Sequence, residues 1–165
     1  MPDDEQVVEG EQTEDYGEPI KSVPVMKILV PTSFGSRSSL ALEFALGYSQ
    51  SHNAEVYLFH AHDTKTSDFR RLDRINEEML SLMKNAVMSA IEILRDRGIH
   101  HAVGRVHRRI SHGKAWMEIL KISAGISADM VIMGAPRDST FNRLITKAPC
   151  TIVLVKEKDQ AFVVE

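Results

Sequence analysis

The chain has 165 residues, 43% of them hydrophobic, which is typical of one compact domain with a sizeable core. Its net charge of −3 is uneven: residues 1–20 hold eight acids and no Lys or Arg, whereas residues 21–165 hold 20 basic and 15 acidic residues. No apolar run approaches the ~20 residues of a membrane span, and the acidic start does not resemble a signal peptide, so we expect a cytoplasmic protein with no membrane partner.

The sequence divides into a folded domain and two tails. Residues 1–24 are acidic and poor in apolar residues, so they cannot bury enough surface to offset the entropy of ordering and we expect a disordered tail. Residues 25–156 form the domain, and 157–165 a charged C-terminal tail. The acidic tail has two open interpretations: it only aids solubility, or it lies on the basic edge at Arg105–Arg109 and competes with an acidic partner.

Along the domain, apolar runs of strand length alternate with stretches of helical period. The expected strands are 25–30, 55–61, 102–110, 129–134 and 151–155. The expected helices are 40–48, 68–97, 114–126 and a short one within 137–147. Strands that alternate with helices, and that are apolar on both faces, predict an α/β fold. We therefore expect a Rossmann-like doubly wound sheet of five parallel strands in the order 3-2-1-4-5, with helices on both faces.

Ligands of such sheets bind beyond the C-terminal strand ends, where the strand order reverses. In this chain that edge lies at the loops after Val30, His60 and Met133. The candidate residues of this crevice are Pro31, Thr32, Ser33, His60, Ala61, Met133, Gly134 and Arg137.

Motifs of catalysis are missing from these loops. The chain has no G-x-S-x-G turn, no Walker loop and no G-x-G-x-x-G, and Thr32 and Ser33 follow the first strand where a receiver domain would carry acids. His60 and His62 lie one residue apart at a strand end, but no further metal ligands can be identified. The basic residues are scattered, without interleaved aromatic residues. We therefore expect no catalytic residues, no metal and no nucleic-acid partner. The single cysteine, Cys150, excludes an internal disulfide and fits a reducing compartment.

Five segments of the chain carry a resemblance to a known family. They are ILVPTSFGS from residue 28, AEVYLFHA from residue 54, the His-Gly-Lys turn at residue 112, ADMVIMG from residue 128 and APCTIVLV from residue 148. In this order and register they resemble the universal stress protein family. The resemblance covers roughly residues 25–156 and implies a Rossmann-like fold. It also implies one of two kinds of member, those that bind ATP and those that do not.

The resemblance implies a degenerate ATP site. Family members that bind ATP have an acid after the first strand and the signature G-x-x-G-x9-G-[S/T], whose glycines let backbone N–H groups approach the phosphates. In this chain Gly134 matches the first glycine, but the second falls on Arg137 and the Gly-Ser/Thr pair on Lys147-Ala148. Ser33 stands at the position of the acid. The side chains of Arg137, Arg143 and Lys147 could still bind an anion in place of the missing glycines.

The sequence thus favours a non-catalytic universal stress protein-like binding or regulatory module that does not bind ATP tightly and has no cofactor. The alternative is a member that binds or slowly hydrolyses ATP or AMP through a shortened phosphate loop. A third hypothesis is a regulatory domain related to those fused to membrane transporters. Such a module would act by binding another protein.

The last strand predicts a homodimer. Thr151, Ile152, Val153, Leu154 and Val155 form an apolar strand at the edge of the expected sheet, and a free apolar edge tends to pair. Antiparallel pairing of two copies would satisfy its backbone groups, and the resemblance implies the same contact. Alternatively, the segment after Lys156 folds back over this edge.

Overall fold

The computed structural model describes residues 10–15, 25–63, 66–99, 105–136, 140–157 and 160–164. Its helices and strands are, in chain order, β1 (Gly10–Asp15), β2 (Met26–Pro31), α2 (Ser36–His52), β3 (Ala54–His62), α3 (Phe69–Asp96), β4 (Arg105–His112), α4 (Ala115–Gly125), β5 (Met130–Gly134), α5 (Thr140–Lys147), β6 (Thr151–Glu157) and β7 (Gln160–Val164).

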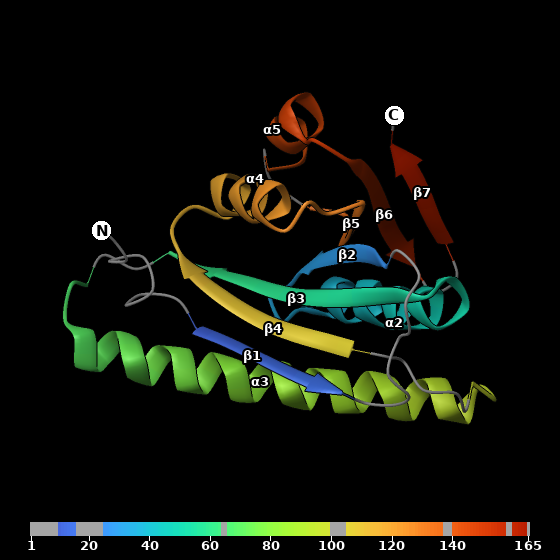
Figure 1. The fold of residues 1–165 in the computed structure, drawn as a ribbon, viewed down its shortest axis with the longest axis horizontal. Coiled ribbons are helices and arrows are strands. Elements are labelled where there is room, and N and C mark those ends of the chain that lie inside the picture. Colours follow the sequence, from blue (N-terminus) through green and yellow to red (C-terminus); the bar gives the residue numbers. More distant parts are fainter. Residues whose placement is uncertain are drawn as a thin grey trace.

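These strands form a single sheet in the order β1-β4-β3-β2-β5-β6-β7 (Figure 1). The five central strands are parallel and lie in the relative order expected from the sequence. The sheet of the described residues nevertheless differs from the expected one, because it has seven strands and is mixed: β1 and β7 pair antiparallel at its two ends. The α/β class with a doubly wound parallel centre is confirmed.

Each face of the sheet buries its own apolar cluster, because strand side chains alternate between the faces. Ile28 and Val30 of β2 pack with α2 and α3, and Met83 of α3 is fully buried among them. Leu29, between them in sequence, packs on the opposite face with Ile119 of α4. Figure 1 places α3 on one side of the sheet and α4 and α5 on the other.

The longest helix, α3, has well-defined ends. The Asp68 side chain accepts a hydrogen bond of 3.0 Å from the Arg70 backbone N–H, which caps the first turn. Past the last turn, Gly98 adopts a φ of +88°, a left-handed conformation that glycine tolerates best. The helix predicted over 68–97 is therefore found within one residue at each end.

The N-terminal expectation needs a correction. Residues 10–15 do not belong to a disordered tail: they form β1 and pair with β4 along six positions, from Gly10 opposite Ile110 to Asp15 opposite Arg105. The sequence-based expectation was wrong here because it weighed only apolar burial, whereas this strand is held by backbone pairing and by polar contacts to basic β4 side chains. The remainder of the expected tail, residues 1–9 and 16–24, lies outside the described residues.

The C-terminal expectation is corrected in the same way. The segment expected as a tail folds back as β7 and pairs with β6, with Val163 opposite Val153 and Phe162 opposite Leu154. Because β5 pairs with the other side of β6, residues 151–155 are not a free edge. The alternative in which the chain's own end covers this strand is the arrangement found.

No helix in the described ranges combines the length and the apolar character needed to cross a membrane.

Candidate functional site

A cavity of about 500 Å³ lies where the C-terminal ends of β2, β3 and β5 meet the first turn of α2. The structure brings seven of the eight candidate crevice residues together around it: Pro31, Thr32, Ser33, His60, Ala61, Met133 and Gly134. The eighth, Arg137, lies outside the described residues. That these residues hold a cofactor stays a prediction.

The loop after β2 forms one wall of the cavity and is held by its own short polar side chains. The Phe34 backbone N–H donates to Thr32 Oγ1 at 3.0 Å, and the Ser33 N–H donates to Ser38 Oγ at 3.0 Å. Phe34 itself has a φ of +65°, which is uncommon for a residue other than glycine. The Thr32 N–H donates to the Phe59 carbonyl at 2.7 Å, so the loop is tied to β3.

The first turn of α2 forms a second wall, which sequence reasoning missed. Gly35, Ser36, Arg37 and Ser38 line the cavity, and the N-cap Gly35 supplies no side-chain cap to the free backbone N–H groups. Such a helix start favours an anion. Sequence patterns gave the Ser/Gly turn but not the direction of the helix that follows it.

The end of β5 approaches this helix very closely. A Cβ built on Gly134 would lie 2.7 Å from both the carbonyl carbon and the carbonyl oxygen of Arg37. The Arg37 guanidinium then reaches across and donates to the Ala135 carbonyl at 2.8 Å. Gly134, which matches the first glycine of the family signature, is thus required by helix packing whether or not a phosphate binds. Arg37 therefore lines this side of the cavity and holds the loop after β5 through this hydrogen bond.

His60 lines the cavity at the end of β3 and is held in one tautomer. Its Nδ1 lies 2.8 Å from the Thr32 carbonyl oxygen, which can only accept, so Nδ1 carries the proton. Burial lowers the pKa of His60, and the nearby His62 lowers it further, while the hydrogen bond to Thr32 opposes both. The imidazole is therefore neutral at pH 7, with Nε2 as an acceptor. The Phe34 ring packs on it at 4.7 Å between ring centroids.

Two further imidazoles continue from His60 along the same sheet edge. Ring centroids are 5.9 Å apart for His60 and His62 and 5.8 Å apart for His62 and His112. His112 Nε2 lies 2.9 Å from Asn76 Oδ1. The sequence prediction missed His112, although the expected strand order places the end of β4 beside that of β3, where His112 pairs with His62. In the described part of the chain, no cluster of three or more His, Cys, Asp or Glu could hold a metal ion.

Stability is expected to fall as the pH drops below neutrality. Burial lowers the pKa values of His60, His107 and His112 in the folded state. Each of these imidazoles therefore becomes protonated at a lower pH in the folded protein than in the unfolded chain, where the pKa of histidine is about 6.5. The unfolded chain binds these protons first, so their stabilisation is complete above pH 6.5 and is lost as the pH falls through the lowered values. Melting temperatures at pH 7.5, 6.5 and 5.5 should decrease in that order.

Two single variants check the cause of this pH dependence. His60→Gln should reduce the slope of melting temperature against pH, and His52→Gln, at an exposed position on α2, serves as the control for losing one imidazole elsewhere. A melting temperature that does not change from pH 7.5 to 5.5 in the unmodified protein contradicts the prediction.

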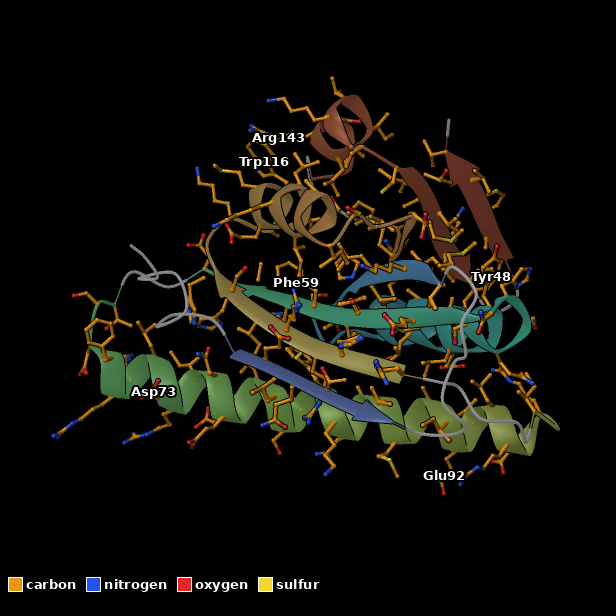
Figure 2. The ribbon with its side chains drawn as sticks, in the orientation of Figure 1. Tyr48, Phe59, Asp73, Glu92, Trp116 and Arg143 are labelled. Atoms are coloured by element: carbon orange, nitrogen blue, oxygen red, sulfur yellow. The ribbon has the colours of Figure 1, made fainter. Side chains whose placement is uncertain are left out.

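Arg143 and Lys147, which the sequence left open as anion ligands, contact an aromatic ring. The Arg143 guanidinium lies 4.9 Å and the Lys147 ammonium 5.5 Å from the centroid of the Trp116 ring. Figure 2 shows Arg143 on α5 beside Trp116 on α4. Cation–π contacts of this kind hold α5 against α4. Both cations therefore have a structural use, and neither lines the described cavity.

The chemistry available in the cavity is limited. Among the described lining residues there is no carboxylate, and the one cation, Arg37, already donates to Ala135. Ser33 Oγ and Ser38 Oγ lie 3.2 Å apart and pair with each other, and within the described residues neither hydroxyl bonds to an imidazole. The described walls thus offer neither an activated nucleophile nor a carboxylate ligand for Mg²⁺.

Comparisons with known proteins agree with this fold. The family model "Universal stress protein family" matches residues 24–156. The structure resembles universal stress protein UspA from Lactobacillus plantarum, with 19% identity, a TM-score of 0.58, and coverage of 82% of this chain and 100% of that one. It also resembles the Archaeoglobus fulgidus universal stress protein in complex with dAMP, with 19% identity, a TM-score of 0.56, and coverage of 79% and 98%. A universal stress protein in complex with cAMP has 12% identity, a TM-score of 0.58, and coverage of 79% and 95%. No curated protein matches the sequence.

Proposed function

Because the chain belongs to the universal stress protein family, we propose that it is a non-catalytic binding or regulatory module whose crevice does not bind ATP tightly. One observation carries this proposal: the cavity has the volume of a ligand site, but its described walls offer no free cation for a triphosphate and no carboxylate for the adenine ring or for Mg²⁺. The one cation among these walls, Arg37, is engaged within the protein. A stress-response role and a cytoplasmic location are parts of the same proposal, and the presence of a single cysteine, Cys150, fits a reducing compartment.

The residues of the connection between β5 and β6 support the same proposal. Gly134 ends β5 and Thr151 begins β6, and the chain between them includes α5, which packs on α4 through Trp116. A backbone cradle for three phosphates would have to come from this connection, where Gly134 retains only the first of the signature glycines. We infer that this connection, without the later glycines, cannot bring enough backbone N–H groups close to a triphosphate to enclose it.

A purine mononucleotide such as AMP is the second candidate. Its support is the cavity volume of about 500 Å³, which is within the ~300–1,000 Å³ of small-molecule sites, together with the open first turn of α2. Similar structures carry dAMP and cAMP, although at identities of 19% and 12% they bear on the fold of this chain rather than on its ligand. One phosphate at a helix start needs no glycine loop.

A thermal-shift panel separates these proposals. A ligand at 100 times its Kd adds about 2.7 kcal/mol, roughly 5–10 °C for a domain of this size. We expect 1 mM ATP with Mg²⁺ to shift the melting temperature by less than 1 °C. A shift of several degrees with AMP or cAMP, but not with ATP, would favour the mononucleotide candidate. A shift of that size with ATP contradicts the leading proposal.

The homodimer stays a prediction, and the structure adds a condition to it. Residues 151–155 pair with β5 on one side and with β7 on the other, so two copies could join through β6 only after β7 leaves. We propose that β7 keeps this contact closed in the intact chain.

A further inference from the structure

The outer edge of β4 is covered by a strand from the far end of the sequence. β1 pairs with β4 antiparallel, and about ninety residues separate the two in the chain (Figure 1). A strand that covers an edge satisfies the free backbone N–H and C=O groups there. Without β1, these groups of β4 would be open to any extended peptide.

The two strands have opposite charge. β4 reads RVHRRISH, with three arginines and no acid, whereas β1 reads GEQTED, with three acids and no base. Because the pairing is antiparallel and in register, each described β1 side chain has a partner opposite it. The Arg109–Glu11 ion pair spans 3.4 Å, Arg108 Nη2 donates to Gln12 Oε1 at 2.8 Å, and Thr13 Oγ1 lies 2.8 Å from His107 Nδ1.

The β4 side of this contact is preorganised. Arg108 is only 3% exposed, and its Nη1 donates to the Leu80 carbonyl of α3 at 2.6 Å, so its guanidinium is fixed. Arg109 lies over the Tyr57 ring, 5.4 Å from the centroid, and the His107 ring stacks on the same tyrosine at 4.2 Å. These cationic and polar groups are set on a rigid strand.

The β1 side, in contrast, has no apolar anchor. GEQTED contains no hydrophobic side chain, and Glu11, Gln12 and Thr13 are exposed. Exposed ion pairs contribute little stability each and weaken with salt. The strand is therefore held by backbone hydrogen bonds and by charge. Another extended acidic segment can make the same two kinds of contact with β4.

We propose that the outer edge of β4 is a docking site for an extended acidic segment of a partner protein, and that residues 10–15 are its tethered, exchangeable occupant. The partner pairs its backbone with β4, while its acidic and amide side chains meet Arg108 and Arg109. This mode of recognition adds a strand to a sheet edge, where backbone pairing gives affinity and side chains give specificity. The tether raises the local concentration of β1 and so excludes weak competitors.

The test uses the full chain and a fluorescent peptide, VEGEQTEDYG, which is the sequence of residues 8–17. In the double variant Glu11→Lys/Gln12→Lys, positive charges face Arg109 and Arg108, so β1 should leave the edge. The control Asn85→Lys/Glu92→Lys changes the net charge equally at exposed positions of α3. Figure 2 shows Glu92 on that helix. By fluorescence anisotropy at 50 mM NaCl, the first variant should bind the peptide at least 10-fold more tightly than the unmodified protein or the control.

The binding specificity of the β4 edge distinguishes an acidic segment from other possible occupants. A peptide with lysine in place of each acid should not bind the Glu11→Lys/Gln12→Lys variant, and 300 mM NaCl should weaken the acidic peptide several-fold. Equal binding of both peptides, or no gain over the unmodified protein, overturns the proposal. It is also overturned by tighter binding of single-stranded RNA than of the peptide, or by a dimer of the unmodified protein that exchanges β1 between two copies.

Hydrogen exchange on the unmodified protein tests the same proposal without a variant, so the result does not depend on whether a variant folds. The amides of residues 10–15 should exchange faster than those of β3, and faster still in 0.5 M NaCl. Protection of residues 10–15 equal to that of β3, unchanged by salt, would show a permanent strand and overturn the proposal.

Discussion

Gly134→Ala is expected to destabilise the protein by about 1–3 kcal/mol, as overpacking against rigid neighbours does. The added Cβ would lie 2.7 Å from the carbonyl carbon and oxygen of Arg37, which belong to the backbone of α2 and cannot rotate away. Either α2 or the end of β5 must shift, and the hydrogen bond from Arg37 to the Ala135 carbonyl would be strained with it. Urea denaturation followed by circular dichroism measures the change.

Gly47→Ala is the matched control. Gly47 lies within α2, and its added Cβ would be 3.8 Å from a Leu94 methyl group, an ordinary contact. Alanine is favoured over glycine in a helix by about 0.5–1 kcal/mol, so this variant should be more stable than the unmodified protein. If Gly134→Ala is as stable as the unmodified protein, α2 does not require a glycine at the end of β5.

Removal of residues 158–165 is expected to convert the protein to a dimer at tens of micromolar. The deletion takes away β7 and leaves the outer edge of β6 unpaired, with apolar Val153 and Leu154 on a strand that has no partner there. Pairing of two β6 strands about a two-fold axis restores the missing hydrogen bonds in one closed contact. Light scattering should show twice the mass.

The full-length variant Val163→Thr is the control, because Val163 is 62% exposed and the substitution keeps the backbone of β7. It should behave as the unmodified protein in light scattering. A truncated protein that melts cooperatively yet stays monomeric at 50 µM contradicts the prediction. Open-ended aggregation of the truncated protein contradicts it as well, because a closed two-fold contact stops at two copies.

The central sheet could be predicted from the sequence, whereas its two edges could not. The strands around Leu29 and Ile132 are buried on both faces, so their apolar runs are distinct. β1 has no apolar residue, and its partner lies about ninety residues away, so a local pattern carries no signal for it. β7 is apolar enough to be a strand, but it is short and follows a charged run, which made a tail the natural expectation.

The candidate site was predictable in position but not in detail. The rule that ligands bind at the C-terminal strand ends gave residues such as Thr32, His60 and Gly134, which do line one cavity. The hydrogen bond from Arg37 to the Ala135 carbonyl could not be predicted, because it depends on the angle at which α2 crosses β5. The third imidazole, His112, could have been found by combining the expected strand order with the positions of histidines at strand ends.

Isothermal titration calorimetry with ATP and Mg²⁺ tests the central claim most directly. The cavity offers an open helix start, but its described walls hold no carboxylate, and the one cation among them, Arg37, is bound to the Ala135 carbonyl. With 50 µM unmodified protein we expect no saturable heat up to 1 mM ATP, which corresponds to a Kd weaker than about 1 mM. A one-to-one isotherm with a micromolar Kd would contradict the account.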